Sequence, residues 1–132
     1  MLKKIDLGFL VLGLALLIWG HYWGLFIAPP EREMGEVYRI IYTHVPAAWM
    51  ALLAFTGTLI ASLIFLFTGS FKADATAEAT AEVGVFFNVL TLLTGAIWGK
   101  PTWGVYWTWD PRLTTAAIMC IAFAGYLALR RF

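Results

Sequence analysis

The sequence WGKPTWGVYWTWDPRLT, residues 98–114, indicates how this chain is organised. It contains four of the protein's seven tryptophans and lies between two apolar runs that are each long enough to cross a bilayer. Connecting loops are usually small and polar, because their backbone groups need water. A loop with five large aromatic side chains, two cations and one acid therefore either beds into the membrane interface or presents an aromatic surface to a flat apolar molecule.

The composition of the whole chain is that of an integral membrane protein. Of the 132 residues, 61% are hydrophobic and 13% are charged, about half the charged share of a typical soluble domain. The net charge of +1, with no basic cluster, gives no indication of a nucleic-acid partner. The single cysteine, Cys120, lies inside an apolar run and provides no disulfide framework.

Four apolar stretches are predicted to cross the bilayer, at residues 7–28, 45–69, 83–99 and 113–129. Each is near the ~20 residues that a spanning helix needs. The predicted fold is therefore an all-α integral membrane protein with four transmembrane helices, forming a single polytopic domain over residues 1–132. The tryptophan-rich loop, residues 98–112, connects the third and fourth spans. Aromatic residues follow the first span where a signal peptide would have a small-residue cleavage site, so we expect a retained helix.

The lysines and arginines beside the spans predict the orientation, because cytoplasmic loops carry an excess of these residues. On one side fall Lys3, Lys4, Lys72, Arg130 and Arg131, and on the other fall Arg32, Arg39, Lys100 and Arg112. The basic pairs at the two ends of the chain agree with each other for an even number of spans. We therefore predict cytoplasmic termini and an outward-facing tryptophan-rich loop.

The chain has two histidines that could bind a ligand. His44 follows Thr43, a possible helix N-cap, and precedes Pro46, which is tolerated in a first helical turn. This places His44 at the entrance of the second span, on the side of the tryptophan-rich loop. Neutral imidazole is a common metal ligand, and a histidine that caps a helix or meets headgroup water is an equally good interpretation. For His21, beside the interfacial aromatics of the first span, headgroup contact is the favoured interpretation.

Local patterns predict two features of the tryptophan-rich loop. Asp110 and Pro111 fit the N-cap and first position of the helix that forms the fourth span, with Arg112 in its first turn. Trp103 and Trp107 share one face of the chain whether the loop is helical or extended. In either conformation we expect an aromatic, sheet-like surface, which is more than an interfacial anchor needs.

The segment between the second and third spans, residues 69–82, is predicted as an inner loop with helical, alanine-rich character. Asp74, Glu78 and Glu82 are spaced four apart in it, and residues at this spacing lie on one face of a helix. Such a cluster could hold a metal ion or receive a cytoplasmic partner. A solvated acidic face is the favoured interpretation.

The residues of the tryptophan-rich loop carry a family resemblance. The sequence WGVYWTWDP, residues 103–111, resembles the WWD motif of the haem-handling proteins of cytochrome c maturation, whose pattern is Trp-Gly-x-Trp-Trp-x-Trp-Asp. The sequences WGKP, residues 98–101, and YRIIYTHVPAA, residues 38–48, resemble one branch, the haem exporter protein C or CcmC family. Because two motifs occur in the family's order, each before a span, the resemblance is specific and covers most of the chain.

The resemblance implies a haem-handling protein rather than an enzyme. Such a protein binds b-type haem non-covalently at the periplasmic face of the bacterial inner membrane and presents it to the haem chaperone CcmE. The implied partners are the ABC transporter subunits CcmA and CcmB and the small membrane protein CcmD. His44 matches an axial ligand of the haem iron, and cations suit the propionates through charge-assisted hydrogen bonds. The implied haem-binding residues are His44, Trp103, Gly104, Tyr106, Trp107, Trp109, Asp110 and Arg112, with Lys100 and Arg39 as further candidate cations.

The sequence departs from the family pattern in ways that leave alternatives open. Tyr106 replaces the second tryptophan of the motif, and Pro111 also occurs among related haem lyases. Family members continue beyond a fourth span to a second ligating histidine in a later outer loop. We therefore expect a truncated member: a fragment, half of a split protein, or a form that recruits its second ligand elsewhere. The alternative functions are a haem lyase component, which attaches haem to apocytochrome cysteines, and a non-haem membrane scaffold or small transporter.

Overall fold

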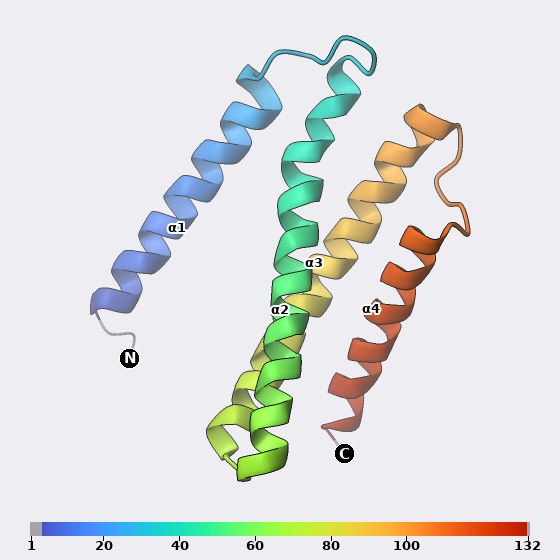
Figure 1. Cartoon of the computed structure of the whole chain (residues 1–132). Helices are drawn as coiled ribbons and strands as arrows, with labels where there is room; N and C mark the ends of the chain where they lie inside the picture. Colours follow the sequence, from blue (N-terminus) through green and yellow to red (C-terminus); the bar gives the residue numbers. More distant parts are fainter. Residues whose placement is uncertain (1–3, 132) are drawn as a thin grey trace. The chain divides into compact units, whose positions relative to one another are not determined.

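The computed structural model describes residues 4–131, and four long helices make up most of it. The helices are α1 (Lys4–Tyr22), which a π-helical turn (Trp23–Ile27) extends, then α2 (Ile41–Thr68), α3 (Phe71–Trp103) and α4 (Pro111–Leu129) (Figure 1). A 3-10 helix, Glu36–Ile40, leads into α2. All four long helices are apolar and long enough to cross a membrane, and residues 4–131 contain no strand. The all-α prediction with four spanning helices is confirmed.

The chain divides into two compact units, Met1–Thr43 and His44–Phe132, which we describe separately. Lys3, one of the basic residues from which the orientation was predicted, lies outside the described residues. In the first unit, Gly24 packs against the ring of Tyr42: a Cβ atom on Gly24 would lie 2.7 Å from Cγ of Tyr42. Arg39 donates a hydrogen bond from Nη1 to the carbonyl of Leu25 at 2.6 Å, which leaves this guanidinium engaged within its own unit.

The structure moves the predicted start of the second span. Thr43 was expected to cap it, but α2 begins at Ile41 and Thr43 lies inside the helix. The reason is the preceding 3-10 turn, whose carbonyls at Tyr38 and Arg39 already accept the backbone N–H of Ile41. Because earlier backbone carbonyls take this role, no side-chain cap is needed at Thr43.

The predicted inner loop, residues 69–82, is not a loop. Only Gly69 and Ser70 separate α2 from α3, at the lower end of the second unit in Figure 1. Gly69 makes the reversal with a φ of 64°, which a residue without a side chain adopts at little cost. The alanine-rich sequence beyond it has high helix propensity, so it continues into the third span as one helix of 33 residues.

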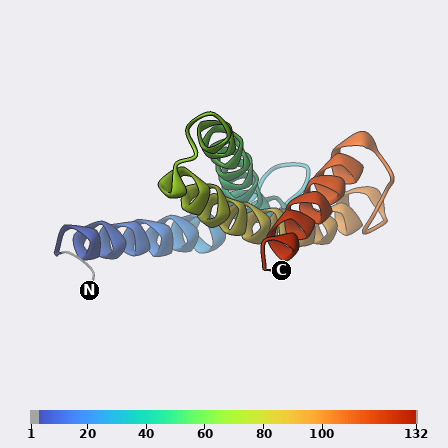
Figure 2. The same cartoon turned by 90° about the horizontal axis from the view of Figure 1, so that it is seen from below.

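Small residues bring the helices of the second unit together. In membranes, helices associate by close packing rather than by the hydrophobic effect, so small side chains at the interface are favourable. The ring of Phe55 on α2 sits over Gly84 of α3 and stacks on Phe123 of α4, with ring centroids 4.0 Å apart. Figures 1 and 2 both show α4 running beside α3. The buried alanines that line these contacts are Ala47, Ala51, Ala54, Ala61, Ala77 and Ala81.

Hydrogen bonds between helices fix the register of this packing. The hydroxyls of Thr58 on α2 and Thr80 on α3 lie 2.9 Å apart. Asn88 of α3, only 4% exposed, donates from Nδ2 to the carbonyl of Ala116 on α4 at 3.0 Å. A buried amide without a partner costs free energy, so Asn88 holds α4 at one height along α3.

Candidate functional site

The predicted site residues gather at one end of the second unit, where α2 starts, α3 ends and the α3–α4 connection runs (top of Figure 1). A cavity of about 130 Å³ opens there. Its lining combines one histidine, two tryptophans, one acid and one cation from three helices. The lining residues are His44, Gly95, Trp98, Trp103, Asp110, Arg112 and Leu113.

His44 is held against α3 by three residues of that helix. Its Nδ1 lies 2.9 Å from the hydroxyl of Thr94. A Cβ atom on Gly95 would lie 3.1 Å from Cε1 of His44, so the imidazole packs close to the α3 backbone. The Trp98 ring meets the imidazole edge-on, at 63° and 5.8 Å between centroids. Among the described residues nothing bonds Nε2 of His44, so this nitrogen is available to a ligand.

The end of α3 carries two tryptophans that sequence reasoning placed in the loop. Residues 98–103 are helical, and the helix ends only at Gly104. Trp98 and Trp103 lie 6.4 Å apart with their rings tilted by 41°. The guanidinium carbon of Arg112 stands 5.8 Å from the Trp103 ring centroid, a cation–π geometry. Trp103 is 55% exposed, so its ring remains accessible.

Gly104 ends α3 because its backbone is left-handed. Its φ is 79°, and its N–H bonds the carbonyl of Lys100 at 3.0 Å, a common way for glycine to close a helix. The side chain of Lys100 donates from Nζ to the Gly104 carbonyl at 2.9 Å and lies 5.4 Å from the Tyr106 ring centroid. Lys100, a candidate for the propionates, is therefore engaged with the loop itself.

The connection between α3 and α4, residues 104–110, does not present one flat aromatic surface. Trp107 and Trp109 are 5.5 Å apart and nearly perpendicular, at 81°. Trp109 is 81% exposed, whereas Trp107 is half-buried. The expected sheet-like surface is thus replaced by two aromatic pairs, Trp98 with Trp103 and Trp107 with Trp109. The cause is that α3 ends at Gly104, between Trp103 and Trp107, so the stretch is neither helical nor extended throughout.

Asp110 caps α4, as predicted. Its carboxylate accepts from the hydroxyl of Thr108 at 2.7 Å and from the backbone N–H groups of Arg112 and Leu113 at 2.9 and 3.2 Å. The Thr108 hydrogen bond, together with those backbone groups, holds the pKa of the Asp110 carboxyl below its ordinary value. Pro111 occupies the first turn, where its missing N–H is not needed. Asp110 therefore has a structural role at the edge of the site.

Arg112 is the cation best placed to meet an anion at this site. Its Nε pairs with Asp110 at 3.4 Å, but its side chain is 78% exposed, so this contact stabilises little. Among the described residues its terminal nitrogens have no hydrogen-bond partner. Arg112 also lines a second cavity of about 490 Å³ between α2, α3 and α4, so one guanidinium borders both spaces.

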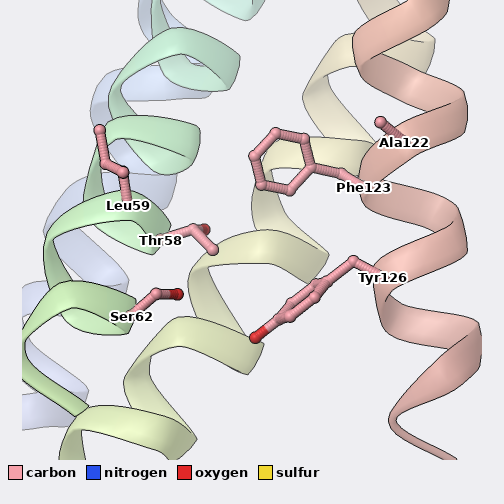
Figure 3. Close-up of a pocket in the computed structure, with 6 residues that line it drawn as sticks. All are labelled: Thr58, Leu59, Ser62, Ala122, Phe123 and Tyr126. Carbon is pink, nitrogen blue, oxygen red and sulfur yellow. The ribbon is translucent and has the colours of Figure 1, made fainter. Parts of the chain in front are cut away.

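A third cavity lies further from these groups and lacks their chemistry. It measures about 290 Å³ between α2 and α4, where Phe123 and Tyr126 reach toward α2 (Figure 3). Its lining offers hydroxyls but no histidine. The lining residues are Thr58, Leu59, Ser62, Ala122, Phe123 and Tyr126. The chemistry for binding a metal complex is concentrated at His44.

The groups around His44 suit a flat, aromatic, anionic metal complex. An unshared imidazole nitrogen ligates a metal, aromatic rings pack on a conjugated disc, and a guanidinium pairs with carboxylates. The indole N–H groups of Trp98 and Trp107 are buried without a hydrogen-bond partner among the described residues, and buried donors of this kind are uncommon unless they serve a ligand. At about 130 Å³, the cavity is smaller than the ~300–1,000 Å³ of ligand pockets, so it has room for only part of such a molecule.

Sequence reasoning did not assign a role in the site to Thr94, Gly95 and Trp98, which surround His44. The signal that could have found them is helical spacing: Thr94 and Trp98 are four residues apart and share a face of α3. Their relation to His44, fifty residues earlier, depends on the packing of α2 against α3. Helical spacing within α3 alone therefore cannot predict the contact with His44.

Comparison with known proteins places this chain among relatives of similar sequence. All of residues 1–132 match the family described as CcmC: Heme exporter protein C. The chain is 42% identical over 113 residues to heme exporter protein C of Rhodobacter capsulatus, covering 86% of this chain and 47% of that protein. It is 40% identical over 126 residues to heme exporter protein C of Haemophilus influenzae, covering 96% and 51%.

A third relative is a protein of Marchantia polymorpha named as a ccmC-like mitochondrial protein of cytochrome c biosynthesis. It is 42% identical over 111 residues, covering 84% of this chain and 49% of that protein. The chain therefore spans about half the length of the curated relatives it matches. With a family match over its whole length and the histidine and tryptophan-rich motifs brought to one end of its helices, this chain belongs to the heme exporter protein C (CcmC) family.

Proposed function

We propose that this chain binds haem through the site around His44 and hands it on during cytochrome c maturation, without transforming a substrate. The observation that carries this proposal is Nε2 of His44, which has no hydrogen bond within residues 4–131 and lies beside Trp98, Trp103 and Arg112. Axial ligation by histidine and the surroundings of the iron tune how a haem behaves. The names of the relatives, which describe heme export, support the same role.

Each part of the site has a function in this proposal. His44 is the axial ligand, and the rings of Trp103, Tyr106, Trp107 and Trp109 pack against the porphyrin. Arg112 meets a propionate, since its terminal nitrogens have no hydrogen-bond partner in the described part of the chain and charge-assisted hydrogen bonds to carboxylates are strong. Gly104 and Asp110 shape the loop, because the first ends α3 and the second starts α4.

The partners and location are proposed with it. The haem is b-type and bound non-covalently, and the recipient is the chaperone CcmE, with CcmA, CcmB and CcmD in the same assembly. We place the site at the periplasmic face of the bacterial inner membrane and the termini in the cytoplasm. The basic residues next to the first and fourth spans support this orientation, since such residues favour the cytoplasmic side.

The test is the visible spectrum of the purified full chain with haem supplied, oxidised and reduced, beside two histidine variants. We expect His44→Ala to lose or shift the haem bands. His21→Ala is the matched control, because His21 is not among the residues that line the cavity around His44, and its spectrum should equal that of the wild type. A folded chain that binds no haem, or a His44→Ala variant with unchanged bands, would refute the proposal.

A second measurement separates a haem surface from an interfacial aromatic belt. In a belt, the aromatic rings anchor the chain at the membrane interface and do not contact haem. Substitution of Trp107 or Trp109 then leaves the pigment unchanged. In the proposed site, Trp107→Ala or Trp109→Ala weakens haem binding. Trp19→Ala in α1 is the control, since that tryptophan is exposed and far along the sequence from the site. Equal haem content in all three variants would favour the belt.

A further inference from the structure

We infer that Thr94 is a positioning residue for His44, and that its hydroxyl holds the imidazole in the Nδ1–H tautomer with an unprotonated Nε2. In this form Nε2 carries the lone pair that a metal requires, and the other nitrogen is committed to the protein. The tautomer follows from the structure of the protein alone. Its consequence for iron rests on the proposed function.

The Thr94 hydroxyl has a single proton to donate. Oγ1 of Thr94 lies 2.8 Å from the carbonyl oxygen of Leu90 and 3.2 Å from that of Thr91. Carbonyl oxygens only accept, so the hydroxyl donates its proton to the helix backbone, as threonines in helices commonly do. Its lone pairs are then left for His44 Nδ1 at 2.9 Å, and Nδ1 must be the donor.

The proton on Nδ1 decides the state of the second ring nitrogen, Nε2. A neutral imidazole has one N–H, so a proton on Nδ1 leaves Nε2 without one. The hydrogen bond that one ring nitrogen makes decides which nitrogen is free to ligate. Among the described residues no group competes for Nε2 of His44. The lone pair of Nε2 is therefore open on a half-buried side chain that lines the cavity.

Packing restricts the orientation of the ring as well as its protonation. Gly95 and Trp98 follow Thr94 on α3, and both pack against the imidazole. Gly95 lies against Cε1, and the Trp98 ring meets the imidazole edge-on. A side chain at position 95 would press on the ring, since its Cβ would lie 3.1 Å from Cε1. Histidines that bind metals are usually oriented by such a partner on the other nitrogen, and removal of the partner typically costs 10–100-fold in metal affinity.

The first experiment reads the tautomer without haem. The full chain is labelled with ¹⁵N-histidine, placed in lipid nanodiscs and held near pH 8, above the ordinary imidazole pKa of about 6.5. We expect His44 to show a protonated Nδ1 and an unprotonated Nε2. His21 gives an internal reference, because its Nδ1 faces the carbonyl of Leu17 and must also be the protonated nitrogen. A protonated Nε2 on His44 in the wild type would overturn the inference.

Variants then test whether Thr94 is the cause. Thr94→Val keeps the shape of the side chain and removes the acceptor, so His44 should change to the Nε2–H form while His21 stays the same. Thr94→Ser restores the hydroxyl and should restore the tautomer. Thr56→Val is the matched control, since the Thr56 hydroxyl donates to the carbonyl of Leu52 in its own helix. A His44 tautomer that is the same in Thr94→Val as in the wild type would overturn the inference.

Haem titration of the same variants separates this inference from the proposed function. We expect Thr94→Val to bind haem about 10–100-fold more weakly, with Thr94→Ser and Thr56→Val close to the wild type. If His44→Ala binds haem like the wild type, the proposed function fails, and the NMR result still decides the tautomer. If His44→Ala loses haem but Thr94→Val keeps both the wild-type affinity and tautomer, the inference about Thr94 fails alone.

Discussion

Arg130 at the end of α4 and Asp74 in the first turn of α3 form a bidentate ion pair. Nη1 and Nη2 of Arg130 each lie 2.7 Å from one carboxylate oxygen of Asp74. The same guanidinium is 3.4 Å from Glu78 and stands 5.5 Å from the Tyr126 ring centroid. The hydrogen bonds with Asp74 raise the pKa of Arg130. Asp74 and Glu78, two residues of the predicted acidic face, therefore both pair with Arg130. They do so because α3 is continuous and brings them beside the end of α4.

Removal of Arg130 should loosen α4 from α3. We expect Arg130→Ala to lower the unfolding temperature of the full chain in detergent, because Asp74 and Glu78 then repel each other without a cation between them. Arg131→Ala is the control, since the side chain of Arg131 is exposed and has no described polar contact. The double variant Arg130→Asp with Asp74→Arg should recover most of the loss. Equal unfolding temperatures for the two arginine variants would show that the pair contributes nothing.

Gly84 should not tolerate a side chain. A Cβ atom on Gly84 would lie 2.5 Å from Cδ1 and Cε1 of Phe55, and Phe55 cannot withdraw because it stacks on Phe123. Overpacking of this kind typically costs about 1–3 kcal/mol, which we expect in the unfolding free energy of Gly84→Ala. A Cβ atom on Gly125 of α4 meets nothing within 4 Å among the described residues, so Gly125→Ala should be neutral or slightly stabilising. A Gly84→Ala variant as stable as Gly125→Ala would contradict the packing of α2 against α3.

Gly104 is expected to be required for its backbone conformation rather than for contact with haem. At a φ of 79°, a residue with a Cβ atom costs about 1–2 kcal/mol, and asparagine visits this region more readily than alanine. Gly104→Ala should therefore destabilise the chain by about this amount, and Gly104→Asn by less. Unfolding free energies measured by denaturant titration check the order of the two variants. The reverse order would assign Gly104 a role other than ending α3.

The cap of α4 should depend on pH through Asp110. The pKa of Asp110 is lowered by the Thr108 hydrogen bond and the backbone N–H groups, so the carboxylate form stabilises the folded state. By linkage, this stability is present above the unfolded pKa of about 3.9 and is lost as pH falls through the lower folded pKa. We expect the protection factor of the Leu113 amide, which compares its exchange with intrinsic exchange at the same pH, to fall below about pH 4.

Asp110→Asn provides the control for that pH dependence. Asparagine still accepts the backbone hydrogen bonds of an N-cap but does not titrate. The variant should therefore keep the cap and lose the change in protection factor at low pH. If the variant and the wild type show the same pH profile, another group is responsible for the titration.

Local sequence predicted the features that depend on neighbouring residues. Asp110 followed by Pro111 is a helix start that needs no tertiary information, and the structure has that cap. The four apolar stretches likewise correspond to four helices, because the length and hydrophobicity of a segment decide whether it can cross a bilayer as a helix. The boundaries were less predictable: α3 runs unbroken from Phe71 to Trp103, across both an expected loop and part of the tryptophan-rich stretch.

The site shows the same division between local and tertiary information. Composition and spacing were enough to predict that one histidine and a cluster of tryptophans would flank membrane spans. The contacts of His44 with Thr94, Gly95 and Trp98, and of Arg130 with Asp74, come from the packing of the helices. The physical reason is that these contacts join distant residues through helix packing, and the height and rotation of one helix against another depend on all the small side chains between them.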